Sequence, residues 1–245
     1  MKKIVFLVIM AITLIACKEK LTKRENCYPE NLSKVFSKHG GLDKWNELKQ
    51  LSFRIGNEKH LVDLHTRKSV IISKSYSIGF DGEKAWLQQK DSMSFKGNKD
   101  FYYNLYFYFY AMPFVLADNG IVFEESKSLV FDGVSYPGIK VSYKANIGSS
   151  PDDNYYMYYN PDSFQMEWLQ YSVTFFSKKV SSKVNTIRYN DWITIDGVLL
   201  PNSLTWYKKD EKGNILEPAR SATVFTNQKV STKKLDESIF HKPKE

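Results

Sequence analysis

Apolar and polar residues alternate along much of the chain from residue 51 onward. The alternating apolar positions include Leu51, Phe53 and Ile55, then Ile139, Val141 and Tyr143, and later Leu204 and Trp206. A period of two residues is typical of β-strands with one buried face and one wet face. A wet face also excludes an all-parallel α/β sheet, because both faces of such a sheet are covered.

Turn signals separate these alternating segments. Asp-Gly pairs stand at 81–82, 132–133 and 196–197, and residues 160–163 read Asn-Pro-Asp-Ser. Asp-Gly between apolar runs is a strong hairpin signal, and Asn, Pro, Asp and Ser are common turn residues. The sequence therefore predicts a mainly β (α+β) fold, an antiparallel meander of about nine to eleven strands of ordinary length.

Two short helices are predicted before the first strand. Apolar residues follow helical spacing between residues 30 and 38, and the glycines at 40 and 41 should end this helix, because glycine adopts a left-handed cap without strain. The second helix begins at Leu42 and places Trp45 and Leu48 on one face. His39, at the end of the first helix, would favour the helix dipole if it carried charge.

The segment from residue 98 to 120 breaks the alternation. Eight of the ten residues 101–110 are aromatic, and Met112, Pro113 and Phe114 follow. This apolar density is too continuous for a half-wet strand, and proline cannot continue a helix. We therefore expect a helix that is broken near Pro113. A plain core helix and a lid over a cavity both remain open for it.

The N-terminus carries a targeting signal. Lys2 and Lys3 precede an apolar run that ends in Leu14-Ile15-Ala16-Cys17. This segment resembles a bacterial lipoprotein signal, and the run is shorter than the ~20 residues of a membrane span. The resemblance implies cleavage before Cys17 and attachment of diacylglycerol and a further acyl chain, such as palmitate, to that residue. We expect a signal peptide over 1–16, a lipidated tether over 17–27 and a single β domain over 28–245, on the periplasmic side of the outer membrane.

The amino-acid composition limits the kinds of partner that this protein is expected to bind. Hydrophobic residues make up 42% of the chain and aromatic residues 15%, enough for a large core. The net charge of +8 falls to +6 when the leader and its two lysines are removed. An exported protein meets little nucleic acid, so an anionic membrane surface is the nearer partner for this charge. Cys27 would be the one thiol left, which excludes an intramolecular disulfide and a paired-cysteine metal site.

Catalytic motifs are missing from the sequence. It contains no His-Glu-x-x-His, no Gly-x-Ser-x-Gly and no phosphate-binding glycine-rich loop, and residues 231–234 match Ser-x-x-Lys without its partner motifs. His60 and His65 lie five apart and would point to opposite faces of a strand, which leaves Asp63 and His65 as too few ligands for zinc. We expect these residues to be polar groups on the surface, and expect no metal, no cofactor and no enzymatic activity.

Three short motifs resemble an uncharacterised family of bacterial envelope lipoproteins related to the lipoprotein carriers LolA and LolB. The motifs are His39-Gly40-Gly41-Leu42 with Trp45, the turn and strand Asp196–Pro201, and the closing segment Leu235–Pro243. The resemblance implies a LolA/LolB-like fold, which is a curved antiparallel half-barrel whose open apolar side is covered by the N-terminal helices and the inserted helix. In the carriers, that concave side holds acyl chains.

Together, these observations predict a lipid-anchored envelope protein that binds a hydrophobic or lipid-like ligand in the half-barrel. The acyl chains of lipoproteins are one candidate ligand. Eight side chains combine apolar bulk with an inward position and are the candidate cavity residues: Trp45, Phe53, Tyr106, Phe109, Met112, Phe114, Trp168 and Trp206. One alternative is a structural or interaction lipoprotein with a fully packed barrel. Another is a hydrolase that uses a titratable pair such as Asp63 and His65.

Overall fold

The computed structural model describes residues 28–143, 153–177 and 184–244 of the 245-residue chain. The predicted leader, the tether, Cys17 and Cys27 lie outside the described residues, so the division of the chain at residues 16 and 27 stays a prediction. None of the described helices is long and apolar enough to cross a membrane.

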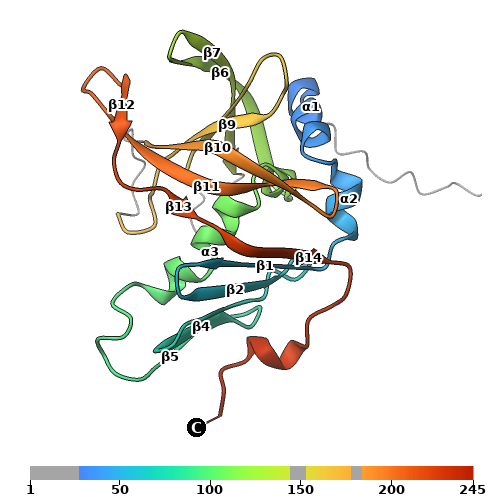
Figure 1. Ribbon diagram of the computed structural model, residues 1–245, viewed down its shortest axis with the longest axis vertical. Helices are drawn as coiled ribbons and strands as arrows, with labels where there is room; N and C mark the ends of the chain where they lie inside the picture. Colours follow the sequence, from blue (N-terminus) through green and yellow to red (C-terminus); the bar gives the residue numbers. More distant parts are fainter. Residues whose placement is uncertain (1–27, 144–152, 178–183, 245) are drawn as a thin grey trace, which may run out of the picture.

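The fold is mainly β, and its strands form two open antiparallel sheets that lie one above the other in Figure 1. The lower sheet has six strands in the order β14-β1-β2-β3-β4-β5. Its strands are β1 (Gln50–Ile55), β2 (Glu58–Asp63), β3 (Ser69–Ile72), β4 (Tyr76–Phe80), β5 (Ala85–Gln89) and β14 (Thr226–Ser231).

The upper sheet has eight strands, seven of them in the order β12-β11-β10-β9-β8-β7-β6, with β13 paired to β11. Its strands are β6 (Ile121–Phe131), β7 (Val134–Tyr143), β8 (Tyr155–Tyr159), β9 (Met166–Tyr171), β10 (Asn185–Ile195), β11 (Val198–Lys209), β12 (Ile215–Pro218) and β13 (Thr223–Val224). Most neighbours along the chain pair with each other, but β5 and β6 belong to different sheets, β13 pairs with β11 instead of β12, and β14 returns to the lower sheet beside β1.

The predicted fold class is confirmed, while the described residues contain fourteen strands rather than nine to eleven. The added strands are short: β3 and β12 have four residues each and β13 has two, too few to show a period of two. The Asp-Gly turns at 132–133 and 196–197 are two-residue hairpins, with all four residues at positive φ.

Three α-helices of the described residues lie where the sequence predicts them. They are α1 (Glu30–Lys38), α2 (Leu42–Glu47) and α3 (Lys99–Tyr110), with short 3-10 helices η1 (Phe114–Ala117) and η2 (Glu237–Phe240). Gly40 has a φ of 109° between α1 and α2, and a Cβ atom there would lie 2.3 Å from the carbonyl oxygen of Gly197. Glycine at this position therefore permits both the left-handed turn and the close approach of the β10–β11 hairpin.

His39 corrects the expectation of a charged helix end. Its side chain is fully buried and stands edge-on to the Trp192 ring, at 4.5 Å between centroids. The backbone N–H of Met166 donates a hydrogen bond to Nε2 over 3.3 Å. Burial, with a smaller contribution from the charge of Lys38, lowers the pKa of His39 from 6.5 to about 3. The imidazole is therefore neutral and ties α1 to the upper sheet.

We expect His39 to make the fold sensitive to acid. Below pH 6.5 the unfolded chain binds a proton at His39, whereas the folded chain does not until about pH 3, so stability falls with acidification across this window. The loss is at most ~1.4 kcal/mol per pH unit. His39→Gln keeps an acceptor for Met166 and should flatten the pH dependence of the unfolding free energy, measured in urea. His241→Gln, at an exposed position, is the control. An unchanged slope in His39→Gln would contradict this account.

Candidate functional site

The segment from α3 to η1 fills the space between the two sheets (Figure 1). Helix α3 begins after Asn98, whose side-chain oxygen accepts a hydrogen bond from the Asp100 N–H at 2.9 Å. It ends at Tyr110, because Pro113 has no N–H to donate and cannot extend a helix. The chain then turns into η1. The predicted break near Pro113 is confirmed.

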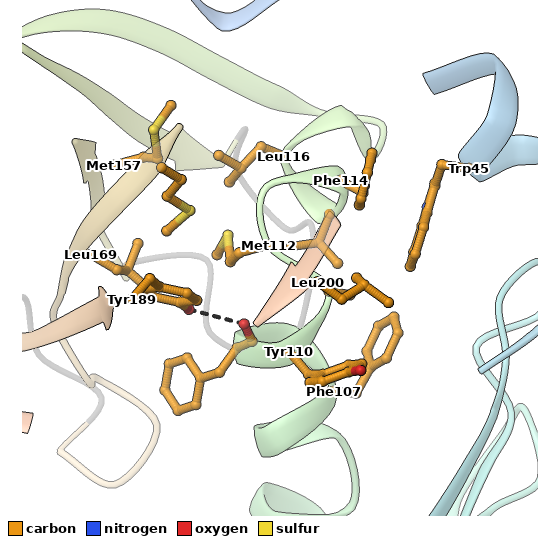
Figure 2. Packing of buried hydrophobic residues seen from close by; sticks show 14 of the residues in the cluster. Trp45, Phe107, Tyr110, Met112, Phe114, Leu116, Met157, Leu169, Tyr189 and Leu200 are labelled. Atoms are coloured by element: carbon orange, nitrogen blue, oxygen red, sulfur yellow. Dashed lines mark hydrogen bonds between the residues drawn. The ribbon is translucent and has the colours of Figure 1, made fainter. Parts of the chain in front are cut away.

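The residues after the break are almost completely buried. Figure 2 shows Met112 and Leu116 turned toward Met157 and Leu169 of the upper sheet. None of these four side chains is more than 2% exposed. The Tyr189 hydroxyl donates a hydrogen bond to the Phe109 carbonyl at 2.9 Å, drawn as a dashed line in Figure 2. Each large apolar side chain buried in this way contributes roughly 1.5–3 kcal/mol to stability.

Ring contacts join the segment to its surroundings on several sides. Phe114 stacks on Trp45 of α2, with centroids 4.5 Å apart and planes 4° apart (Figure 2). Tyr110 stacks on Phe53 of β1 at 4.4 Å. Phe109 meets Trp206 of β11 edge-on at 5.8 Å. Such pairs stabilise contacts by ~0.5–1.5 kcal/mol beyond simple burial. One segment therefore packs against a helix and both sheets.

The structure brings seven of the eight candidate cavity residues together. Five of them belong to the main buried cluster and two pack against its margin: Trp45, Phe53, Phe109, Met112 and Phe114, then Tyr106 and Trp206. Trp168 lies apart, in a cluster with Leu129, Tyr136 and Tyr158. The alternation of β9 explains this, because Leu169 and Tyr171 face the main cluster and leave Trp168 on the other side of the strand.

A hollow of about 360 Å³ that is open to solvent lies beside Tyr102, in the first turn of α3, but the space farther along the helix is small. A space of about 50 Å³ lies between α3 and the lower sheet. Eight described residues line it: Val62, Arg67, Ser69, Phe80, Tyr103, Asn104, Phe107 and Tyr108. Pockets for drug-sized ligands have volumes of roughly 300–1,000 Å³. Between α3 and the lower sheet, the described side chains themselves occupy the place that a ligand would take.

A polar contact holds the far end of the segment. Asp118 directly follows η1 and forms an ion pair with Arg67, in the turn after β2. The Arg67 guanidinium also lies over the Phe107 ring, 5.1 Å from its centroid. Burial raises the pKa of Asp118 above its usual value, although Arg67 acts in the opposite direction.

A second polar contact holds the near end. The Tyr102 hydroxyl on α3 donates to the Glu58 carboxylate, at 2.9 Å from Oε2. Tyr76 also donates to Glu58, and His60 Nε2 lies 3.1 Å from the same carboxylate. Burial alone would raise the pKa of Glu58, but the hydrogen bonds from His60, Tyr76 and Tyr102 outweigh it and keep the pKa below its usual value. Glu58 is thus held as an ion.

Sequence reasoning missed Glu58, Arg67 and Asp118. Arg67 and Asp118 are 51 residues apart, and Tyr102 and Glu58 are 44 apart, so no local spacing shows either pair. A charged residue next to an alternating strand looks the same whether it pairs or faces water. These contacts are visible only in the folded chain.

The two histidines were expected on the surface, and His60 is instead buried. His60 is 3% exposed and stacks on Phe53 at 4.7 Å, whereas His65 lies in the turn after β2 near the carbonyl oxygens of Asn46 and Leu48. Asp63 accepts hydrogen bonds from the backbone N–H groups of His65 and Thr66 and so shapes that turn. Among the described residues, no three His, Cys, Asp or Glu side chains are grouped as a metal site would need.

Comparison with known proteins identifies a family and a fold. Residues 63–217 match a family described as "Family of unknown function (DUF6503)". No curated protein matches the chain. Among solved structures, the chain is similar to a DUF1329 family protein from Desulfovibrio piger, with a TM-score of 0.50 and 9% identity over 87% of this chain and 98% of that one. At this identity the likeness concerns the fold alone.

Two further structures are weaker likenesses. A LolA superfamily protein from Nitrosomonas europaea has a TM-score of 0.42 and 10% identity, over 85% of this chain and 96% of that one. An outer membrane lipoprotein-sorting protein domain from Vibrio parahaemolyticus has a TM-score of 0.44 and 8% identity, over 86% and 94%. One of the structural neighbours is thus described as a LolA superfamily protein, while the relation of this chain to the carriers stays a prediction.

We expect Glu58→Gln to loosen the near end of the segment. The change replaces charge-assisted hydrogen bonds and should lower the free energy of unfolding by about 2 kcal/mol at pH 7. Because the pKa of Glu58 is lower in the folded chain, its stabilisation exists above the unfolded pKa of 4.5 and is lost as the pH falls through the folded value. The difference in unfolding free energy between wild type and Glu58→Gln should therefore narrow as the pH falls below 4.5. Exposed Glu83→Gln is the control, and an equal effect there would refute the assignment.

Proposed function

We propose that this chain, which belongs to the DUF6503 family, binds a hydrophobic or lipid-like ligand between its two sheets. A lipid anchor at Cys17 would hold it on the envelope membrane, at the periplasmic side of the outer membrane. The role is one of binding, without catalysis. Acyl chains, such as those of lipoproteins, are the class of ligand that a long apolar interior suits.

One observation carries this proposal. A single contiguous segment, α3–η1, fills much of the apolar interior between the open sheets, while the sheets meet directly at β14, where the Gln228 side chain donates to the Pro201 carbonyl of β11 at 3.3 Å. The walls on either side are apolar, with Leu51 from the lower sheet and Val141, Met157 and Leu200 from the upper sheet fully buried. If the segment withdraws, those walls line an apolar hollow that an acyl chain can occupy.

The exchange is energetically reasonable because it replaces one apolar contact by another. A ligand that covers the walls restores the burial lost by the segment, at ~25 cal/mol per Å². The ligand shifts the chain toward the open state only by its preference for that state. The polar contacts at the two ends, Tyr102 with Glu58 and Asp118 with Arg67, therefore set how readily the segment leaves.

A second function is favoured by the quality of the packing. The stacked rings of Trp45 and Phe114 and the hydrogen bond from Tyr189 are typical of a core that is packed without a ligand. If the segment never leaves, the chain is a membrane-tethered structural or interaction protein whose outer surface carries its role. The two functions differ in one measurable property, the uptake of an apolar ligand.

We expect Cys17→Ser to release the protein from membranes. The resemblance to a bacterial lipoprotein signal implies that this thiol is the attachment point, and two or more acyl chains are needed for stable anchoring. The measurement is the share of full chain in the membrane fraction, together with incorporation of labelled palmitate. Cys27→Ser is the matched control and should remain on the membrane. Palmitate incorporation that persists in Cys17→Ser would show that the anchor has been assigned wrongly.

We expect Asp118→Asn to increase uptake of a fluorescent long-chain fatty acid. Loss of the ion pair with Arg67 favours the open state by ~1 kcal/mol, or about fivefold in apparent affinity. The measurement is a fluorescence titration of the purified full chain, with native mass spectrometry to detect bound lipid.

The control must lose stability without touching the interior. Trp86→Phe removes a hydrogen bond from the Trp86 N–H to the Phe240 carbonyl, 2.7 Å long, in a separate cluster. Tighter binding in Asp118→Asn alone supports the movable segment. If neither the wild type nor Asp118→Asn contains bound lipid or takes up the probe, the ligand-binding function is refuted. The structural or interaction protein is then the function that remains.

A further inference from the structure

The outer face of the lower sheet carries three basic side chains close together. Phe53 and His60 are directly opposite each other and stack inside the molecule. Their neighbours Arg54 and Lys59 are therefore on the outer face, also directly opposite each other. Lys229 of β14 pairs with Ser52, two residues before Arg54, and so joins the same face.

These side chains surround a hollow of about 400 Å³ that is open to solvent. Six described residues line it: Ser52, Phe53, Arg54, Lys59, Asn227 and Lys229. None of the six is acidic. A β-bulge between β1 and β14, where the register shifts between Ser52 and Arg54, forms one wall and places Asn227 at a φ of 51°.

The three cations are not neutralised by the rest of the described chain. Arg54, Lys59 and Lys229 take part in none of the ion pairs formed among the described residues, although nine such pairs exist elsewhere. Glu58 is a sequence neighbour of Lys59, but its carboxylate points inward to Tyr102. The acidic group nearest in sequence is thus engaged on the opposite face.

The positive charges of Arg54, Lys59 and Lys229 repel one another unless an anion lies between them. Like charges directly opposite each other on antiparallel strands are destabilising, so Arg54 and Lys59 gain nothing from facing each other. An anion between them reverses the sign of the interaction. The planar guanidinium of Arg54 matches the geometry of phosphate oxygens, and the side chains of Ser52 and Asn227 supply further hydrogen-bond donors.

We infer that this hollow binds the phosphate group of an anionic phospholipid head group at the membrane surface. The lipid as the source of the phosphate rests on the proposed anchoring at Cys17, which would place the domain beside a bilayer. Charge complementarity supports the choice, since basic residues near a membrane are attracted to anionic lipids. The rest of the outer face is less available, because η2 packs Phe240 against Val70 and Trp86 there. Contact with lipid on this face would then centre on the basic hollow.

The test uses a soluble short-chain lipid, so that it does not depend on lipidation of Cys17 or on opening of the interior. The full chain in non-ionic detergent is titrated calorimetrically with dihexanoyl-phosphatidylglycerol, dihexanoyl-phosphatidylcholine and inorganic phosphate. Phosphatidylglycerol should bind at least tenfold more tightly than the other two. The double variant Arg54→Gln and Lys59→Gln should weaken its binding about 25-fold, since each basic residue contributes roughly a fivefold change.

A matched control removes two positive charges elsewhere. Lys127→Gln with Lys212→Gln alters exposed residues of β6 and of the β11–β12 turn, and should change binding less than twofold. The variant at the hollow should unfold at no lower urea concentration than the wild type, because it removes a repulsion. This measurement separates lost binding from lost folding.

Three results would overturn the inference. Equal binding of phosphatidylglycerol and phosphatidylcholine would exclude recognition of a negative head group. Equal binding of inorganic phosphate would point to a free anion instead of a lipid. Undiminished binding in the hollow variant would place the contact elsewhere. Failure of the Cys17 anchor by itself would leave all three measurements unaffected, so the two proposals can fail separately.

Discussion

The structure depends on one constraint: two open sheets each present an apolar face that must be covered. A sheet with one apolar face is stable only when another element buries that face. Here a single segment, α3–η1, meets this need for both sheets at once, and the cluster around it includes residues from α1, α2 and both sheets. The turn at Gly40, the buried His39 and the break at Pro113 all bring chain segments into position around this filling.

Strand β2 holds both ends of the segment. Glu58 is its first residue and accepts hydrogen bonds from Tyr102, in the first turns of α3. Arg67 lies in the turn just after β2 and pairs with Asp118, just after η1. Most contacts between these points are apolar, although the hydroxyls of Tyr189 and Ser69 donate to the carbonyls of Phe109 and Tyr103. The polar contacts at its two ends therefore fix the position of the segment, and apolar burial holds it between the sheets. An apolar ligand could replace only the apolar contacts.

Strands β1 and β2 contribute side chains both to the apolar core and to the charged outer surface. On the inner face of β1 and β2, Phe53 and His60 stack within the core, and on the outer face Arg54 and Lys59 meet solvent. Because successive residues point to opposite faces, a strand can contribute to a core and to a charged surface without conflict between them. An apolar ligand inside and a phosphate outside would thus be bound by neighbouring residues of one hairpin.

The sequence by itself determined the local elements of this protein. Alternation placed the strands, Asp-Gly marked the hairpins at 132–133 and 196–197, glycine ended α1, and proline ended α3, because each signal acts through the backbone of a few residues. It also grouped most of the candidate cavity residues, since bulk and phase identify an inward side chain. Trp168 shows the limit of this reasoning: a buried ring on a strand can face either side.

Only the tertiary structure decided what covers the apolar faces. Burial is non-directional, so the sequence showed that an apolar interior exists but not whether a ligand or the chain's own rings fill it. The pairings of Glu58 with Tyr102 and of Arg67 with Asp118 join residues far apart in the chain, and their charges gave no local sign of a partner. The folded chain settles these contacts because packing brings distant residues within reach, a property that no short stretch of sequence contains.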